Sequence, residues 1–115
     1  MSIPESELAK IQAWVAARND ELPVDVADQV RYELDVDARS ATIFECRPPW
    51  REDFGPDWTR MSIARLRYTQ TRREWTLYWS NQHGQFRLYD TLSPAPGVEP
   101  LLAEIDRDPT CIFWG

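Results

Sequence analysis

Three short segments in the middle of the chain alternate between apolar and polar residues, and this pattern constrains the fold more than any other feature. The segments are Ile63–Thr69, Glu74–Ser80 and Gln85–Asp90. Alternation with a period of two is typical of strands that bury one face of a sheet. Four residues connect each segment to the next, a length typical of antiparallel hairpins. The pattern therefore predicts a three-stranded antiparallel sheet with one apolar face.

Loops of four residues determine which side chains share a face of this predicted sheet. Leu66 is expected opposite Leu77, and Leu77 is expected opposite Leu88. The apolar face then has three rows: Ala64/Trp79/Phe86, Leu66/Leu77/Leu88 and Tyr68/Trp75/Asp90. The opposite face, called here the predicted Arg/Tyr face, presents polar side chains from all three strands: Arg65, Arg67, Tyr78, Arg87 and Tyr89.

A further hairpin is predicted upstream, because residues 30–37 alternate and Ala41–Arg47 follow a turn at residues 37–40. Its register depends on the loop length, since a shift of one residue exchanges the two faces of a strand. A three-residue loop would turn the even-numbered residues of the second strand, including Phe44, toward the apolar face. A four-residue loop would turn the odd-numbered residues there, including Ile43. The first alternative is preferred because it buries the phenylalanine.

Two segments carry apolar residues at helical spacing, and they complete the predicted fold. The first runs from Ile3 to Arg18, and the second covers residues 98–107. Together the elements predict an α+β fold: a five- or six-stranded, mostly antiparallel sheet with an N-terminal helix and a C-terminal helix. A length of 115 residues is typical of one domain, so residues 1–115 are expected to fold as a single unit. The apolar segment at residues 110–114 is expected to form a last short strand or a tail that packs against it.

The net charge of −6 is unevenly distributed along the chain. Residues 47–90 carry a net charge of +3, whereas the segments on either side are acidic. An acidic protein has little general affinity for nucleic acid. Cys46 and Cys111 both lie in apolar runs and are expected to be buried, reduced thiols. The absence of a long apolar run and of a basic, hydrophobic leader favours a cytoplasmic protein without a membrane partner.

No residue pattern has the spacing that a metal site or a catalytic site requires. The candidate zinc ligands, Cys46, His83 and Cys111, are scattered single residues rather than close pairs. Asp37 followed by the Glu-Cys-Arg string at residues 45–47 is similar to an Asp and Glu-x-Lys pair that could hold a divalent metal, but arginine replaces the lysine. A divalent-metal enzyme is therefore the weakest of three functions considered. Neither an enzymatic activity nor a cofactor is predicted.

The predicted Arg/Tyr face is the best candidate for a binding surface. Guanidinium and phenol planes side by side can bind an acidic peptide, grip phosphate or stack on bases. The long irregular segment 47–60 adds Trp50 and Trp58 as candidate contacts. We therefore predict a small interaction or regulatory protein that binds an acidic protein surface or peptide, or alternatively a single-stranded nucleic acid, through this face. The competing interpretations are that a helix covers the face, or that it is solvent-facing and structural.

Several Trp-rich strings of the chain resemble one known family. They are ECRPPW at 45–50, GPDWTR at 55–60, ARLRY at 64–68, WTLYW at 75–79 and DPTCIFWG at 108–115. The resemblance is to a family of small bacterial proteins whose domain has no known function, and it spans nearly the whole chain. It implies no activity and no site residues. It does imply a complete, stand-alone protein.

Overall fold

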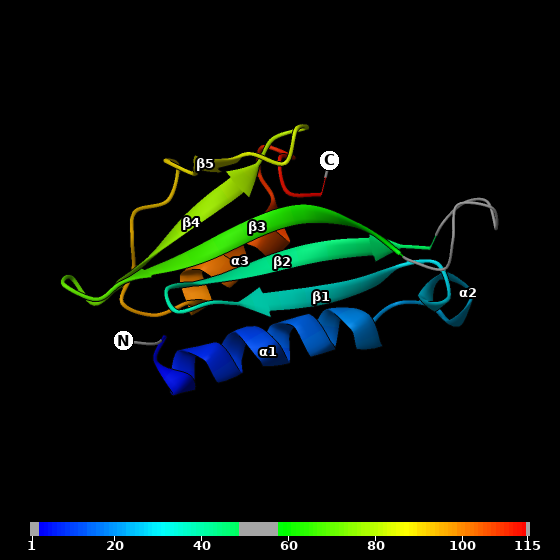
Figure 1. Cartoon of the computed structure of the whole chain (residues 1–115), viewed down its shortest axis with the longest axis horizontal. Helices are drawn as coiled ribbons and strands as arrows, with labels where there is room; N and C mark the ends of the chain where they lie inside the picture. Colours follow the sequence, from blue (N-terminus) through cyan, green and yellow to red (C-terminus); the bar gives the residue numbers. More distant parts are fainter. Residues whose placement is uncertain (1–2, 49–57, 115) are drawn as a thin grey trace.

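Five strands form one antiparallel sheet in which each strand pairs with the next along the chain (Figure 1). The computed structural model describes residues 3–48 and 58–114. The strands are β1 (Arg31–Val36), β2 (Ser40–Arg47), β3 (Thr59–Thr69), β4 (Glu74–Ser80) and β5 (Phe86–Leu88), and the helices are α1 (Glu5–Asp20), α2 (Val24–Ala27) and α3 (Glu99–Arg107). The predicted α+β fold, with a five-stranded antiparallel sheet and a helix near each end of the chain, is confirmed.

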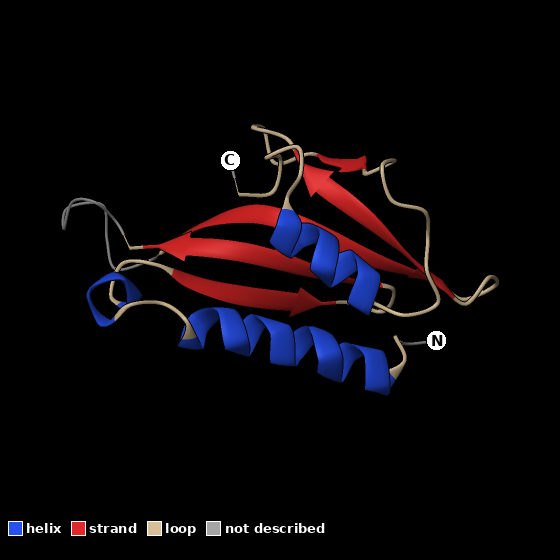
Figure 2. Ribbon diagram, turned by 180° about the vertical axis from the view of Figure 1, so that it is seen from behind, coloured by secondary structure: helices blue, strands red, loops and turns tan. Residues whose placement is uncertain are grey.

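The two long helices lie on one side of the sheet, α1 along β1 and α3 across the middle strands (Figure 2). Between α3 and the sheet lies a core whose largest fully buried side chains include Trp75, Leu66, Leu77, Leu101 and Ile105. These apolar side chains recur at helical spacing in α3 and at alternate positions in the strands. The core therefore follows from the two periodicities of the sequence.

The pairing of β3 with β4 is the predicted one. Leu66 lies opposite Leu77, and the neighbouring rows pair Ala64 with Trp79 and Tyr68 with Trp75. The register between β4 and β5, however, differs by one residue from the prediction, because Tyr78 rather than Leu77 lies opposite Leu88.

The loop between β4 and β5 explains this difference. Asn81 donates its backbone N–H to the carbonyl of Gln85 at 2.9 Å, so only three residues lie between this pair. The Asn81 side-chain oxygen accepts the backbone N–H groups of His83 and Gln85, and Gly84 adopts φ +76°. A three-residue loop with a left-handed glycine at its end is a common hairpin connection. Its odd length reverses the two faces of β5, so the predicted four-residue loop is wrong.

The β1–β2 hairpin has the register of the four-residue loop, which was the alternative that was not preferred. Leu34 lies opposite Ile43, so the four-residue loop is correct and Phe44 faces away from the core. The Asp37 carboxylate fixes this loop, because it accepts the backbone N–H groups of Arg39 and Ser40 at 2.9 Å and the Ser40 hydroxyl at 3.0 Å. Aspartate at the start of a turn commonly makes such bonds. The turn chemistry therefore decided a register that the burial of one phenylalanine did not.

The boundaries of several helices and strands differ by a few residues from the predicted ones. Helix α1 begins and ends two residues later than predicted, with Pro4 preceding its first turn. Strand β3 begins at Thr59 rather than at residue 63, and the short helix α2 after Pro23 was not predicted. Helix α3 was predicted within one residue.

The C-terminal tail packs against the domain, as expected, but not as a strand. The Asp108 carboxylate accepts the backbone N–H groups of Ile112, Phe113 and Trp114 at 2.9 to 3.1 Å. The Trp114 indole donates to the Ile105 carbonyl at 2.7 Å, and its ring stacks on Trp14. This compact turn leaves the cysteine that precedes it, Cys111, exposed. The prediction that both cysteines are buried is therefore correct for Cys46 and wrong for Cys111.

The two leucines of the predicted central row provide a test of the β4–β5 register. Leu77 is 1% exposed, whereas Leu88 is 56% exposed. We expect Leu77→Ala to lower the free energy of unfolding by about 2–5 kcal/mol through lost burial and the cavity left behind. Leu88→Ala serves as the matched control and should cost less than about 1 kcal/mol. Urea denaturation measures both values, and similar losses for the two variants would contradict the observed register.

The thiols provide a second test. In native protein, a polar thiol reagent should label Cys111 and leave Cys46 unlabelled, because Cys46 has no exposed surface and burial raises the pKa of its thiol. Both should label after denaturation. Cys111→Ser is the control that should abolish labelling of the native protein. Rapid labelling of that variant before denaturant is added would show that Cys46 is accessible.

Candidate functional site

The sheet face opposite α1 and α3, called here the outer face, is not covered by any helix of the described residues (Figure 1). Strand alternation places on it the following side chains from the three central strands: Ser40, Thr42, Phe44 and Cys46 of β2, Arg60, Ser62, Arg65, Arg67 and Thr69 of β3, and Glu74, Thr76, Tyr78 and Ser80 of β4. Strands β1 and β5 add Arg31, Glu33, Asp35, Phe86 and Leu88. The predicted alternative that a helix covers this face does not hold for the described chain.

Three arginines of the outer face lie flat on aromatic rings. The guanidinium carbon of Arg31 is 4.2 Å from the ring centroid of Trp58. Arg60 and Arg65 lie 4.0 Å from the ring centroids of Phe44 and Phe86. Each contact of this kind contributes about 0.5–2 kcal/mol and restricts the plane of the guanidinium group. These three cations are therefore held over aromatic rings rather than moving freely.

At one end of the outer face, beside the β1–β2 hairpin, a pocket of about 550 Å³ opens to solvent. We call it the arginine pocket. Its lining consists of Asp37, Ala38, Arg39, Ser40, Arg65, Arg67, Tyr78 and Phe86. The sheet register brings these residues together, because Ser40 lies opposite Arg67 and Arg65 lies opposite Tyr78.

Arg65 is the most firmly held cation of this pocket. Its Nε donates to the Thr42 hydroxyl at 2.9 Å, and its plane rests on the Phe86 ring. Its two terminal nitrogens have no hydrogen-bond partner among the described residues. A guanidinium group fixed from behind in this way presents paired donors, the arrangement that binds carboxylate or phosphate oxygens bidentately.

The arginines of the pocket also form no ion pair within the described residues, although the charge of Arg65 is one of the causes that lower the pKa of Asp37. Within residues 3–48 and 58–114, neither Arg39, Arg65 nor Arg67 forms an ion pair. Asp37 lines the same pocket, and its pKa is lowered chiefly by the hydrogen bond from the Arg39 backbone. That carboxylate stays charged and is held by its own turn. The pocket therefore keeps a net positive charge.

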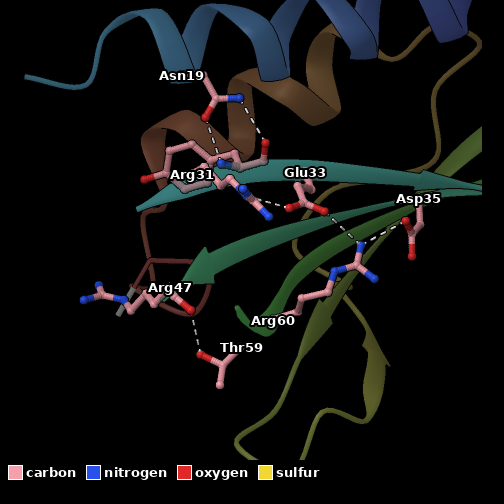
Figure 3. A network of polar contacts seen from close by, with 8 residues as sticks. Asn19, Arg31, Glu33, Asp35, Arg47, Thr59 and Arg60 are labelled. Carbon is pink, nitrogen blue, oxygen red and sulfur yellow. Dashed lines mark hydrogen bonds and ion pairs between the residues drawn. The ribbon is translucent and has the colours of Figure 1, made fainter. Parts of the chain in front are cut away.

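The opposite end of the outer face is neutralised instead (Figure 3). There Arg31 pairs with Glu33 at 2.8 Å, and Arg60 pairs with Asp35 at 2.9 Å. Arg47 also has a partner, Glu45, at 2.7 Å. The contrast between paired arginines at one end and unpaired arginines at the other selects the arginine pocket as the candidate site.

The structure brings together three of the predicted binding residues, Arg65, Arg67 and Tyr78. It separates Arg87, Trp58 and Tyr89 from them. Arg87 lies opposite Trp79, on the helix side of the sheet. Trp58 stacks under Arg31 beyond the far end of β3, about 30 Å from Arg67 at about 3.3 Å per strand residue. Trp50 lies outside the described residues.

Tyr89 is 2% exposed, so its predicted place on the outer face is wrong. The three-residue loop before β5 turns it toward α3. There its hydroxyl donates to the Glu104 carboxylate at 2.7 Å, and the same carboxylate pairs with Arg107. Tyr89 therefore anchors α3 to the sheet and is not available to a partner.

Sequence reasoning did not assign the other five lining residues to a binding site: Asp37, Ala38, Arg39, Ser40 and Phe86. The signals that could have found them are in the turns. Aspartate at position 37 favours the tight loop that sets Ser40 opposite Arg67. Gly84, as the last residue of a three-residue loop, sets Phe86 on the outer face.

The weak metal-enzyme hypothesis depends on acidic residues that the fold does not bring together. Asp37 lies in the β1–β2 turn, whereas Glu45 lies near the far end of β2 and pairs with Arg47. Among the described residues there is no group of three or more His, Cys, Asp or Glu side chains that could hold a metal ion.

Comparison with known proteins finds one similarity. A family model described as a domain of unknown function (DUF3024) matches residues 2–115. Neither a curated protein nor a solved structure matches the chain. No helix among the described residues has both the length and the apolar character needed to cross a bilayer.

The Tyr89 contact generates a prediction about pH. The hydrogen bond from Tyr89 is the main cause that lowers the pKa of Glu104 in the folded protein. The bond therefore stabilises the fold above the ordinary glutamate pKa of about 4.3, and this gain is lost as the pH falls through the lower folded-state value. We expect Tyr89→Phe to cost about 1–3 kcal/mol at neutral pH and progressively less in acid.

Urea denaturation of the variant and the wild type over a pH series measures this difference. Tyr68→Phe is the matched control, because the Tyr68 hydroxyl has no hydrogen-bond partner among the described residues. A difference between Tyr89→Phe and the wild type that grows as the pH falls would contradict the assignment.

Proposed function

We propose that this chain, which belongs to the DUF3024 family of domains of unknown function, is a small binding protein whose arginine pocket receives an acidic segment of another protein. The observation that carries this proposal is the set of contacts that Arg65 makes. It is fixed by Thr42 and Phe86 and has both terminal nitrogens unoccupied by described residues. A guanidinium group that is already held in place loses little conformational entropy when an anion binds, and this favours affinity.

The shape of the pocket favours a short segment rather than a flat protein surface. A volume of about 550 Å³ lies within the usual range of sites that enclose a ligand of a few residues. Tyr78 and Phe86 give the pocket an apolar wall beside its cations. A peptide that places an apolar side chain next to an acidic one would therefore match the lining.

The overall negative charge does not oppose this function strongly. Exposed acidic residues such as Asp25 and Asp28 lie in and beside α2, at the opposite end of a molecule that is 48 Å long (Figure 1). At physiological salt, charges separated by more than about 8 Å of solvent are largely screened. An acidic peptide at the pocket would therefore respond mainly to Arg39, Arg65 and Arg67.

The proposal is tested by measuring how the protein binds an array of short acidic peptides. The matched control peptides have Gln and Asn in place of Glu and Asp. We expect the acidic peptides to bind and the amide-matched peptides to fail. The double variant Arg65→Gln/Arg67→Gln should reduce affinity at least about tenfold, because each charge-assisted bond contributes about 1.5–3 kcal/mol.

The matched control is Arg72→Gln/Arg87→Gln, which removes the same charge outside the pocket and should change affinity less than about twofold. Thermal melting of the double variant shows whether it remains folded, and Arg67→Gln alone, at an exposed residue, should weaken binding without a change in melting temperature. Equal losses in both double variants would contradict a pocket-specific site. Preferential binding of a single-stranded oligonucleotide over every acidic peptide would favour the alternative function, a nucleic-acid binder.

A further inference from the structure

We propose that the acidic group bound in the arginine pocket is a phosphate monoester rather than a single carboxylate. This inference rests on the proposed function and adds the chemical class of the ligand. The pocket is lined by three arginines and one aspartate, so its ionised side chains carry two net positive charges. A phosphate monoester carries a charge of about −1.5 to −2 at neutral pH. One carboxylate carries −1 and would neutralise only half of the positive charge of the pocket.

The arrangement of donors supports the same class. Arg65 and Arg67 are two residues apart on one face of β3, so their Cα atoms lie about 7 Å apart. Arg39 approaches from the β1–β2 turn, which is fastened to β3 because the Arg39 carbonyl accepts the Tyr68 N–H at 2.7 Å. Three guanidinium groups from two directions match the three terminal oxygens of a phosphate group better than the two oxygens of a carboxylate.

The acidic residue of the pocket does not replace the ligand. The Asp37 carboxylate accepts the N–H groups of Arg39 and Ser40 and the Ser40 hydroxyl, so it is oriented into its own turn. Elsewhere on the outer face the arginines have formed their ion pairs within the chain, as Arg60 has with Asp35. The unpaired cations are therefore concentrated where an external anion could reach them.

The apolar wall indicates what carries the phosphate. Tyr78 is half-buried in the pocket, and Phe86 lies beneath the Arg65 guanidinium. A planar group attached to the phosphate could lie against Tyr78 or on the free side of the Arg65 plane. A phosphorylated aromatic side chain of a peptide and a small aromatic phosphate share this chemistry, and we infer the peptide because the proposed partner is a protein.

Calorimetry with phenyl phosphate and benzoate tests the charge class, because both probes present one anionic group on the same ring. We expect phenyl phosphate to bind at least about tenfold more tightly at pH 7.5. Its affinity should fall severalfold between pH 7.5 and pH 5, since the second phosphate proton binds with a pKa of about 6, while the benzoate affinity should not change. Arg67→Gln should weaken phenyl phosphate about tenfold, and the control Arg72→Gln should not.

The possible outcomes separate this inference from the proposed function. If benzoate binds as tightly as phenyl phosphate while acidic peptides still bind, the phosphate assignment is overturned and the function stands. If neither the probes nor the acidic peptides bind, both are overturned. A phosphotyrosine peptide that binds more tightly than the same peptide with tyrosine or glutamate supports a protein partner. Binding of phenyl phosphate without binding of that peptide overturns the peptide source.

Discussion

The burial of Leu66 against Leu77 at the centre of the sheet is the contact on which the other features of this protein depend. Both side chains are fully buried in the core cluster that also contains Leu101 and Ile105 of α3. Once this pair faces the helices, strand alternation sends Arg65, Arg67 and Tyr78 to the outer face. The candidate site is therefore the reverse side of the hydrophobic core, and a loss of the core row would lose the pocket as well.

Two hairpin loops then decide which neighbours join these three residues. The Asp37 turn sets Ser40 opposite Arg67 and brings Arg39 to the pocket. The Gly84 loop turns Phe86 outward and Tyr89 inward. Each loop differs by a single residue from a plausible alternative, and each alternative would exchange the two faces of a strand. The composition of the pocket is therefore controlled by hydrogen bonds in turns that lie at its edge or beyond it.

Ion pairing within the chain accounts for the position of the site on an otherwise charged face. At the end near Trp58, acidic residues of β1 neutralise Arg31 and Arg60. At the hairpin end, the carboxylate that lines the arginine pocket, that of Asp37, is engaged by backbone N–H groups. A surface with many arginines has little preference for a ligand where its charges are compensated. The uncompensated end is the place where an added anion changes the electrostatic energy most.

The sequence by itself determined the fold class, the central β3–β4 register and helix α3, because each depends on a periodicity that extends over many residues. It also identified Arg65, Arg67 and Tyr78, whose positions follow from that register. Only the tertiary structure decided the rest of the site. The faces of β2 and β5 depended on whether a loop had an odd or an even number of residues, and hydrogen bonds accepted by the side chains of Asp37 and Asn81 settled that number. The pairing of Arg60 with Asp35 depended on how β1 and β3 lie in space, which periodicity along the chain does not encode, whereas Arg31 and Glu33 are two residues apart in β1.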